Sequence, residues 1–423
     1  MAILQIGAGG VGWVVAHKLA QNNDVFGDIV LASRTLTKAR TIVESIDRKG
    51  SRKRSEIPIR CVQIDASDLA SLVELIGRVR PALVINVGPP GINANVMSAC
   101  LQAGVSYLDT SVSVDLCSPG QQVPNAYDDQ WSQREAFENS GITAILGAGF
   151  DPGVVNVYCA HASNTLFDRI ETIDIVDVNA GTHGRCFATN FDPETNLLEI
   201  QGDSFYWDDG RWKSVPCHTR SMEFDFPEVG SHRMYSMAHD EVRSLAEYLP
   251  VKRIEFWMAF SENYLKYFNC LRDIGLLSPT PVTVSGGVTV APLKLLKALL
   301  PDPTSLAATY SGRTCIGTII GGFLEDRPRR VFVYNVCDHE ATYQEVEAQA
   351  ISYTTGVPVV AAAMLYVQGE WNKPGVWNLE QLDPAPFLTL VAELGLPWQV
   401  IDLDPNADLV ITDSTMSRTA DVA

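Results

Sequence analysis

Apolar runs of strand length alternate with segments of helical period through the first third of the chain. The apolar runs cover residues 2–6, 28–32, 59–64, 82–86, 105–108 and 142–146. The helical segments cover residues 11–22, a stretch from residue 36 onward, 69–79, 93–103 and 127–140. Such alternation is typical of a parallel sheet covered by helices. We therefore predict an α/β domain with a doubly wound parallel sheet over residues 1–150.

A different pattern begins after residue 150. Alternating strands, for example at 172–178, 282–290 and 330–336, are separated by loops rich in glycine, asparagine and aromatic residues. This pattern predicts a mixed or antiparallel sheet. We expect a second, α+β domain over residues 151–340 that binds substrate and forms a dimer face.

The C-terminal part carries helical and apolar signals again. A helical stretch at 341–354 leads to the apolar run 359–367. We predict that this segment, residues 341–405, returns to pack on the first domain. Residues 406–423 are predicted to form a loosely ordered tail.

Composition and charge narrow the class of protein. With 423 residues, 46% hydrophobic and 19% charged, the chain is expected to be a well-packed globular enzyme of more than one domain. The net charge of −18 argues against nucleic acid and anionic membranes as partners. It suits a cationic ligand, although the same charge is also common in acidic cytosolic proteins for solubility alone.

The cysteines and the apolar segments indicate a cytoplasmic protein without a structural metal. Nine cysteines are scattered without a C-x-x-C pair, which favours reduced thiols over disulfides or a zinc site. The longest apolar stretch, 357–367, is short for a membrane span and contains Pro358. We therefore expect no signal peptide, no membrane anchor and no metal.

The first strand leads directly into a glycine-rich motif, Gly7-Ala8-Gly9-Gly10-Val11-Gly12. Glycines at G-x-G-x-x-G spacing permit a tight turn and let backbone N–H groups approach a pyrophosphate. A strand before the motif and a helix after it are the context that a dinucleotide site requires. Gly7, Gly9, Gly10, Val11 and Gly12 are therefore predicted to bind a dinucleotide, in a domain of the Rossmann type.

The end of the second strand indicates which dinucleotide is bound. Ser33, Arg34 and Thr35 stand where an NAD-selective protein places an acidic residue for the ribose 2′-hydroxyl. The Arg34 guanidinium can pair with a 2′-phosphate, and the hydroxyls of Ser33 and Thr35 can donate to it. We therefore predict NADP(H). The alternative is an arginine that merely caps the helix beginning near residue 36.

Two later turns should complete the cofactor site, because they also follow the carboxyl ends of parallel strands. Asp65 and Ala66 follow the third strand and are predicted to pass the adenine. The turn after the fourth strand should run toward the nicotinamide, and its predicted contacts are Asn86, Val87, Gly88 and Pro89. The basic stretch 48–54 is interpreted as a solvated loop.

Candidates for the chemistry are less well defined. Asp151, in the sequence Gly149-Phe150-Asp151-Pro152-Gly153, either faces the site or caps a helix. Polar clusters at 179–185, 239–241 and 337–340 are either functional or ordinary strand-end loops. The chain contains no H-E-x-x-H, no Cys/His cluster and no G-x-S-x-G, which disfavours metal and covalent-nucleophile chemistry.

Taken together, the motifs resemble the saccharopine dehydrogenase-like superfamily. The resemblance covers nearly the whole chain to about residue 400, and its later blocks resemble the branch that makes polyamines. The sequences that carry it are Gly7-Ala8-Gly9-Gly10-Val11-Gly12, Leu31-Ala32-Ser33-Arg34-Thr35, Gly147-Ala148-Gly149-Phe150-Asp151-Pro152-Gly153, Phe187-Ala188-Thr189-Asn190-Phe191, Asn335-Val336-Cys337-Asp338-His339-Glu340 and Gln349-Ala350-Ile351-Ser352-Tyr353-Thr354-Thr355-Gly356. Trp13 departs from the small residue usual after the glycine motif, and the extension past residue 400 has no inferred role.

The resemblance implies a dimeric, cytoplasmic enzyme that uses NADPH to join L-aspartate 4-semialdehyde to 1,3-diaminopropane or putrescine. An imine forms and is then reduced, so a group must move protons near neutral pH, and His183 is the candidate. Asp151 could hold a diamine nitrogen, and Arg185 could bind the carboxylate of the semialdehyde. Further predicted substrate contacts are Asp109, Thr110, Asn179, Gly181 and Asn190.

Two rival functions remain open. A saccharopine reductase would need clustered arginines for a product rich in carboxylates, whereas the second domain is rich in Asp and Glu. A non-catalytic NADPH-binding regulator would keep the fold without the reaction. The preference between the two diamines stays open, because one methylene changes selectivity only about 10- to 200-fold.

Overall fold

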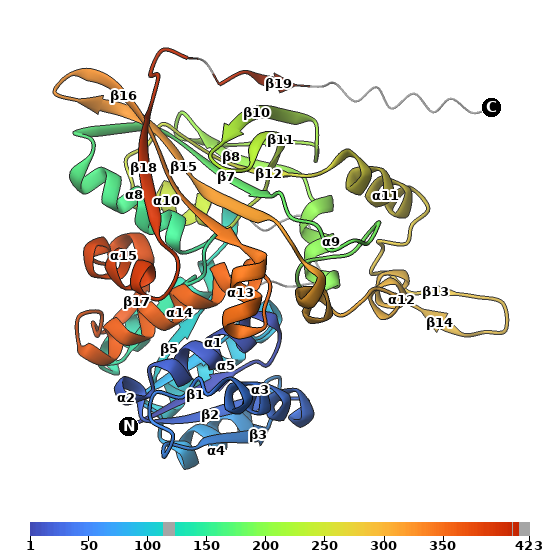
Figure 1. Ribbon diagram of the computed structural model, residues 1–423, viewed down its shortest axis with the longest axis vertical. Coiled ribbons are helices and arrows are strands. Elements are labelled where there is room, and N and C mark those ends of the chain that lie inside the picture. Colours follow the sequence, from blue (N-terminus) through green and yellow to red (C-terminus); the bar gives the residue numbers. More distant parts are fainter. Residues whose placement is uncertain (113–122, 408, 414–423) are drawn as a thin grey trace.

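Two sheets organise the protein, as the computed structural model shows (Figure 1). The structure describes residues 1–112, 123–407 and 409–413. Cys117 and most of the predicted tail therefore lie outside the described residues.

The first domain is the predicted parallel sheet with helices on both faces. Its strands are β1 (Ala2–Ile6), β2 (Asp28–Ser33), β3 (Ile59–Gln63), β4 (Leu83–Asn86), β5 (Ser106–Asp109), β6 (Thr143–Leu146) and β17 (Gly375–Asn378), in the order β17-β6-β5-β4-β1-β2-β3. Successive strand residues enter opposite cores, as Ile3 and Leu4 do, so helices must cover both faces. The strand order reverses between β1 and β4, where such sheets bind their ligands.

The helices of this domain follow the prediction with one exception. They are α1 (Gly10–Gln21), α2 (Asn23–Phe26), α3 (Leu36–Lys49), α4 (Leu69–Val79) and α5 (Asn93–Ala103). The helix predicted over 127–140 was wrong in extent, because two short helices, α6 (Asp128–Trp131) and α7 (Arg134–Asn139), stand in its place. The Ser132 hydroxyl donates to the Asp129 carbonyl at 2.7 Å, a local bond that competes with helix continuation.

The C-terminal segment contributes a helix and a strand to this domain. Helix α14 (Ala350–Gln368) packs along α1, and β17 pairs in parallel with β6. The predicted helix over 341–354 is instead the end of α13 (His339–Val346) and the start of α14, because Glu347 adopts a left-handed φ of 57° between them.

Helix α14 is long and apolar enough to span a membrane by length and composition alone. In the structure, however, 78% of the most apolar 18-residue window of this helix is buried. The core helix of a soluble protein has the same property. Helix α14 extends beyond the apolar run at 357–367 at both ends, and Pro358 lies inside the helix.

The second sheet is mixed and has ten strands. Its main path is β18 (Trp398–Leu403), β16 (Arg327–Asp338), β15 (Arg313–Leu324), β7 (Arg169–Asn179), β12 (Arg253–Ala259), β11 (Gly230–Met237), β10 (Arg220–Phe226) and β19 (Ile411–Asp413), with β8 (Ser204–Asp208) and β9 (Arg211–Val215) alongside β12. Only β7 and β12 pair in parallel along this path among the described strands. The predicted strand 282–290 is a separate hairpin, β13 (Val282–Thr283) and β14 (Thr289–Val290), which projects at the side of the molecule (Figure 1).

Helices connect and cover this sheet. They are α8 (Val154–Thr165), α9 (Pro193–Gln201), α10 (Glu241–Tyr248), α11 (Glu262–Asp273), α12 (Pro292–Leu299) and α15 (Pro384–Glu393). Helix α8 packs on β7 and β15, and α10 packs on β12.

The second sheet curls back on itself. The ring of Phe224 in β10 lies 5.1 Å from that of Phe332 in β16, although four strands separate β10 from β16 in the sheet. The concave face therefore encloses its own apolar core, which includes Trp257 and Tyr334.

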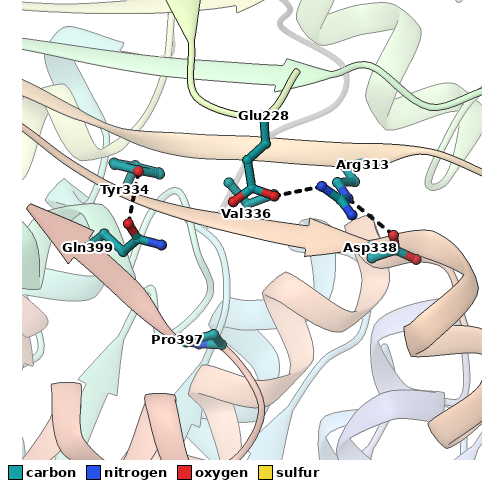
Figure 2. Close-up of a pocket in the computed structure, with 7 residues that line it drawn as sticks. All are labelled: Glu228, Arg313, Tyr334, Val336, Asp338, Pro397 and Gln399. Carbon is teal, nitrogen blue, oxygen red and sulfur yellow. Dashed lines mark hydrogen bonds and ion pairs between the residues drawn. The ribbon is translucent and has the colours of Figure 1, made fainter. Parts of the chain in front are cut away.

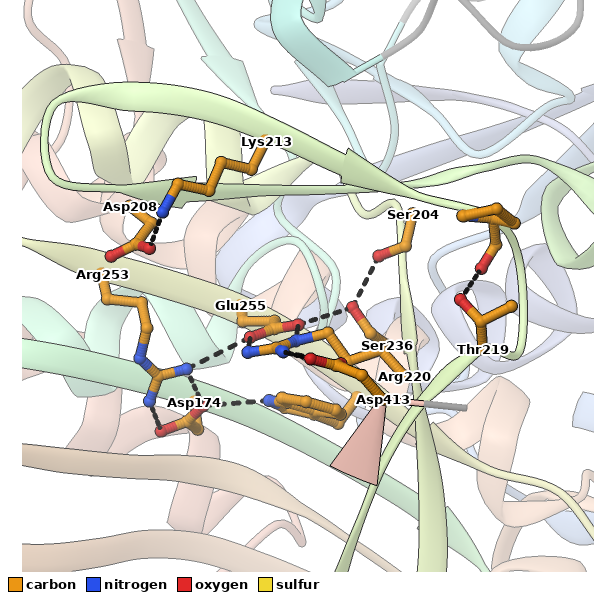
Figure 3. Close-up of polar contacts among 12 residues, drawn as sticks. Asp174, Ser204, Asp208, Lys213, Thr219, Arg220, Ser236, Arg253, Glu255 and Asp413 are labelled. Carbon is orange, nitrogen blue, oxygen red and sulfur yellow. Dashed lines mark hydrogen bonds and ion pairs between the residues drawn. The ribbon is translucent and has the colours of Figure 1, made fainter. Parts of the chain in front are cut away.

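A buried ion network lies on the same side of the curled sheet (Figure 3). Arg253 holds both carboxylate oxygens of Asp174, at 2.6 and 2.7 Å, and Arg220 donates to Glu255 at 2.8 Å. Arg220 also donates to Asp413 of β19 at 2.8 Å. The expectation of a loose tail was therefore wrong for residues 411–413, which pair with β10 and form an ion pair.

Two helical glycines provide a test of the packing between α14 and α1. A Cβ at Gly356 in α14 would lie 2.7 Å from Cβ of Val14 in α1, whereas a Cβ at Gly77 in α4 meets nothing within 4 Å. We expect Gly356→Ala to lower the free energy of unfolding by about 1–3 kcal/mol through overpacking. The matched control Gly77→Ala should raise it by about 0.5–1 kcal/mol through lower chain entropy. Urea unfolding measures both, and a stabilised Gly356→Ala protein would contradict the close packing.

Candidate active site

The glycine turn after β1 depends on close backbone contacts. Gly7 has a φ of +116°, and a Cβ there would lie 2.5 Å from the Val87 carbonyl oxygen. A Cβ at Gly12 would lie 2.4 Å from the Gly7 carbonyl oxygen. Side chains are therefore excluded at both positions, and α1 begins close to the end of β1.

The space in front of this turn is open. A Cβ at Gly9 would meet no atom within 4 Å, and Gly9 is the N-cap of α1 without a side-chain cap. The first N–H groups of the helix are thus free of a capping side chain, and the positive end of the helix dipole faces this space. A pyrophosphate fits here. Val11, in the first turn, packs its side chain partly against the core.

The turn after β2 carries the predicted selectivity residues. The Thr35 N–H donates to the Ser33 hydroxyl at 3.3 Å, and the Arg34 carbonyl accepts from Gln63 Nε2 at 3.1 Å. Among the described residues, the exposed Arg34 guanidinium forms no hydrogen bond or ion pair. The N-cap of α3 is Thr35, so Arg34 is not a helix cap and remains free to bind a phosphate.

The turn after β3 lies beside Arg34. Hydrogen bonds from Ser67 lower the pKa of Asp65, and Arg34 lowers it further. The Asp65 carboxylate accepts from the Ser67 N–H at 3.0 Å and so shapes this turn, while Ala66 is buried.

Asn86 positions the turn after β4. Its buried amide donates to Asn93 at 2.8 Å and to Tyr107 at 3.2 Å, and its oxygen accepts from the Gly88 N–H at 3.2 Å. The side chain therefore holds the turn that contains Val87, Gly88 and Pro89. Pro89 is exposed at its tip.

The prediction that Asp109 contacts substrate is corrected by the structure. Asp109 is fully buried, and its carboxylate accepts from the Gly147 N–H at 2.7 Å, Gln130 at 2.7 Å and Tyr107 at 2.9 Å. Burial raises the pKa of Asp109 to about 7. This residue joins the ends of β5 and β6, and the half-buried Thr110 follows it at the edge of the sheet.

Asp151 lies after β6 at the same edge and does not cap α8, whose N-cap is Gly153. Its pKa is raised well above the usual range, first by burial and then by the neighbouring Asp177 in β7. Glu199 and Glu241 raise the pKa further, whereas His239 lowers it.

Together with Asp240, these acidic residues form what we call the carboxylate cluster: Asp151, Asp177, Glu199, Asp240 and Glu241. Asp240 accepts a hydrogen bond from the backbone N–H of Val112, just after β5. Burial raises the pKa of Asp177 and of Asp240 to about 7. The cluster therefore lies at the carboxyl ends of β5 and β6, where the nicotinamide half of a dinucleotide is expected.

His239 lies within the carboxylate cluster. Its Nδ1 is 2.5 Å from Glu241 and its Nε2 is 3.3 Å from Glu199, and its ring stacks on Phe256 at 3.9 Å. Although burial disfavours the charge, the carboxylates of Glu241 and Glu199 raise the pKa of His239 well above its usual value. With both ring nitrogens facing carboxylates, the imidazolium form is favoured.

A second polar group brings together several predicted residues. Asn179 accepts from the Gly181 N–H at 3.0 Å and bonds His339 at 3.0 Å, and its amide donates to Tyr310 at 2.7 Å. The Tyr310 hydroxyl donates to Asn190 at 2.8 Å. Sequence reasoning missed Tyr310 altogether, whereas His339 belongs to the polar cluster at 337–340 that the pattern did reveal.

The His183 loop adjoins this second group. The His183 ring meets the Tyr310 ring edge-on, with centroids 5.2 Å apart, and its Nδ1 accepts from the Arg185 N–H at 3.2 Å. Burial, followed by the positive charge of Arg185, lowers the pKa of His183. His183 and Asp151 thus lie in different clusters, with Arg185 exposed on the loop.

A surface cavity of about 230 Å³ lies elsewhere, beside β15, β16 and β18 (Figure 2). Arg313 pairs there with Glu228 at 2.6 Å and with Asp338 at 3.3 Å, and Tyr334 donates to Gln399 at 3.1 Å. Asp338, from the polar cluster at 337–340, lines this cavity, but none of the residues predicted to contact cofactor or substrate does, and the charges of the cavity are already paired.

Comparisons with known proteins identify the family. Family models of the saccharopine dehydrogenase NADP binding domain and C-terminal domain match residues 3–145 and 149–396. The chain is 62% identical to carboxynorspermidine synthase of Vibrio alginolyticus, over 97% of this chain and 99% of that protein. It is 42% identical to carboxyaminopropylagmatine dehydrogenase of Synechocystis, over 94% and 97% of the two chains.

A solved structure extends the comparison to the fold. Saccharopine dehydrogenase (L-Glu forming) from Saccharomyces cerevisiae matches with a TM-score of 0.70 at 14% identity, over 95% of this chain and all of that one. The architecture is therefore shared, and the NADP binding domain identifies NADP(H) as the cofactor.

The role of Arg34 can be tested by cofactor affinity. We expect Arg34→Ala to weaken NADPH binding about 10- to 100-fold, the effect of losing charged hydrogen bonds to the 2′-phosphate. NADH, which lacks that phosphate, should bind the variant and the parent alike. Fluorescence titration measures both, and Arg78→Ala, on the exposed surface of α4, is the matched control. Equal losses for NADPH and NADH would contradict the assignment.

Proposed function

This chain belongs to the saccharopine dehydrogenase family, and from that membership we propose that it joins L-aspartate 4-semialdehyde to a diamine in an NADPH-dependent reaction. The diamine is 1,3-diaminopropane or putrescine, and the product is carboxynorspermidine or carboxyspermidine. The protein is an oxidoreductase, and its relatives place it in polyamine biosynthesis. The 62% identity to carboxynorspermidine synthase along 97% of the chain carries the proposal.

The proposed reaction has two steps. A neutral amine of the diamine attacks the aldehyde carbon, water leaves, and an imine forms. Hydride supplied by bound NADPH and one proton then reduce the imine to a secondary amine. The chain's own residues must accept the proton of the attacking ammonium, supply a proton to the departing water, and stabilise positive charge on the iminium.

The carboxylate cluster supports a cationic substrate over a carboxylate-rich one. The charged groups that act on the pKa of Asp151 include Asp177, Glu199 and Glu241, with His239 as the cation. A saccharopine-type product carries several carboxylates, and the acidic residues of the cluster would repel them. A diamine would be attracted, which favours the polyamine reaction over a saccharopine reductase.

We assign three roles on this basis. Asp151 holds a cationic nitrogen of the diamine. His183, whose lowered pKa keeps it neutral near pH 7, accepts the proton of the attacking amine. The exposed Arg185 binds the carboxylate of the semialdehyde. We also propose that the protein acts as a cytoplasmic homodimer through its second domain.

The amine requirement separates the candidate functions. We expect NADPH oxidation, followed at 340 nm, only when both aspartate semialdehyde and a diamine are present. Glutamate with an aldehyde of the lysine pathway should give no oxidation, and agmatine should be a poorer amine than 1,3-diaminopropane. Activity with glutamate and that aldehyde would instead support a saccharopine reductase, and inactivity with every pair would support a regulator.

The pH profile tests His183. Protonated His183 cannot accept a proton, so kcat/KM should fall as the pH drops below the lowered pKa of this residue. We expect His183→Asn to lower kcat about 100-fold or more and to remove that acidic limb. His232→Asn, on the distant strand β11, serves as the control and should keep the parent profile. A variant with unchanged turnover and profile would rule out this role.

A further inference from the structure

The charges of the carboxylate cluster are not balanced within the protein. Both ring nitrogens of His239 are already used by Glu199 and Glu241, so this cation serves those two residues. Asp151 and Asp177 accept no hydrogen bond and form no ion pair with any residue that the structure describes. Asp177, on β7, is nevertheless the charged group with the largest effect on the pKa of Asp151, which follows β6.

A ligand can reach this pair. Asp151 and Asp177 each retain part of their surface, whereas Glu241 and His239 are buried. Two adjacent carboxylates in a region poor in water repel one another unless a proton or a cation lies with them. The pair is therefore suited to an external cation.

Two unpartnered polar atoms, one within the carboxylate cluster and one outside it, point to a ligand. Glu241 is fully buried, and its Oε1 has no hydrogen-bond partner. The Tyr127 side chain is 2% exposed and its hydroxyl is also unpartnered. Burial raises the pKa of Tyr127, and Asp240 and Glu241 contribute, so this hydroxyl lies near the cluster. Buried polar atoms without partners are costly, and a bound polar molecule or its water shell would satisfy them.

We propose that Asp177, together with Asp151, holds the ammonium group of the diamine that does not react. Asp177 thereby determines that the amine substrate carries two amino groups. The inference rests on the proposed function and adds to it a specificity-determining residue. The attacking amine must lose its proton, whereas the distant amine, with a pKa of about 10 as in lysine, stays cationic at neutral pH. A paired carboxylate site recognises that difference.

The unmodified enzyme provides the first test. Propylamine has the same three-carbon chain as 1,3-diaminopropane and lacks the second amino group. We expect its kcat/KM to be at least about 100-fold lower, because the carboxylate pair would be left without its cation. Equal kcat/KM for the two amines would overturn the proposal, whatever the behaviour of any variant.

A variant locates the effect at Asp177. We expect Asp177→Asn to raise KM for 1,3-diaminopropane about 10- to 100-fold and to reduce the preference over propylamine by a similar factor. KM for the semialdehyde and the Kd for NADPH should stay unchanged, which also shows that the variant is folded. The control is Glu171→Gln on the same strand, because Glu171 pairs with Lys252 at 2.9 Å outside the cluster.

The outcomes distinguish this inference from the proposed function. No diamine-dependent oxidation by the unmodified enzyme would refute the function itself. Full activity of that enzyme, with an unchanged amine preference in Asp177→Asn, would refute only the role of Asp177. If Asp177→Asn fails to bind NADPH, the comparison of propylamine with the diamine in the unmodified enzyme decides.

Discussion

The contact between α14 and α1 is the constraint on which the rest of the arrangement depends. Gly356 brings α14 against Val14, and Ser352 occupies the space that a Cβ at Gly10 would need. This contact fixes the C-terminal segment on the cofactor domain, so that β17 can extend the parallel sheet beside β6. The same α1 begins at the glycine turn. Cofactor binding and the joining of the two domains therefore share one helix.

The electrostatics of the site follow from this joining. Asp151 comes from the end of the first sheet, Asp177 from a strand of the second, and Glu199 from a helix between strands. Each carboxylate would be well solvated alone, but together they exclude water from one another. The raised pKa values of Asp151 and Asp177 reflect burial and mutual repulsion. A cationic substrate would relieve both, whereas an anionic one would increase them.

The predicted phosphate site and the proposed amine site lie toward opposite ends of the carboxyl edge of the parallel sheet. At one end, Gly9 and the start of α1 offer an open space with partial positive charge, and Arg34 adds a full charge. At the other end the net charge is negative, apart from His239 held by two carboxylates. In a chain with a net charge of −18, Arg34 therefore supplies a full positive charge at the predicted phosphate site.

The sequence by itself determined the parallel sheet, the glycine turn and the choice of NADP(H), because these depend on neighbours a few residues apart. The alternation of apolar runs and the spacing of Gly7, Gly9 and Gly12 carry that information locally. Only the tertiary structure decided the roles of Asp109 and Asp177. The sequence pattern predicted that Asp109 contacts substrate. Its carboxylate instead accepts hydrogen bonds from the Gly147 N–H and from Gln130. No local sequence signal shows that this residue is buried. In the sequence, Asp177 does not differ from other strand residues. Its electrostatic environment depends on Asp151 and Glu199, which come near it only through the packing of distant segments.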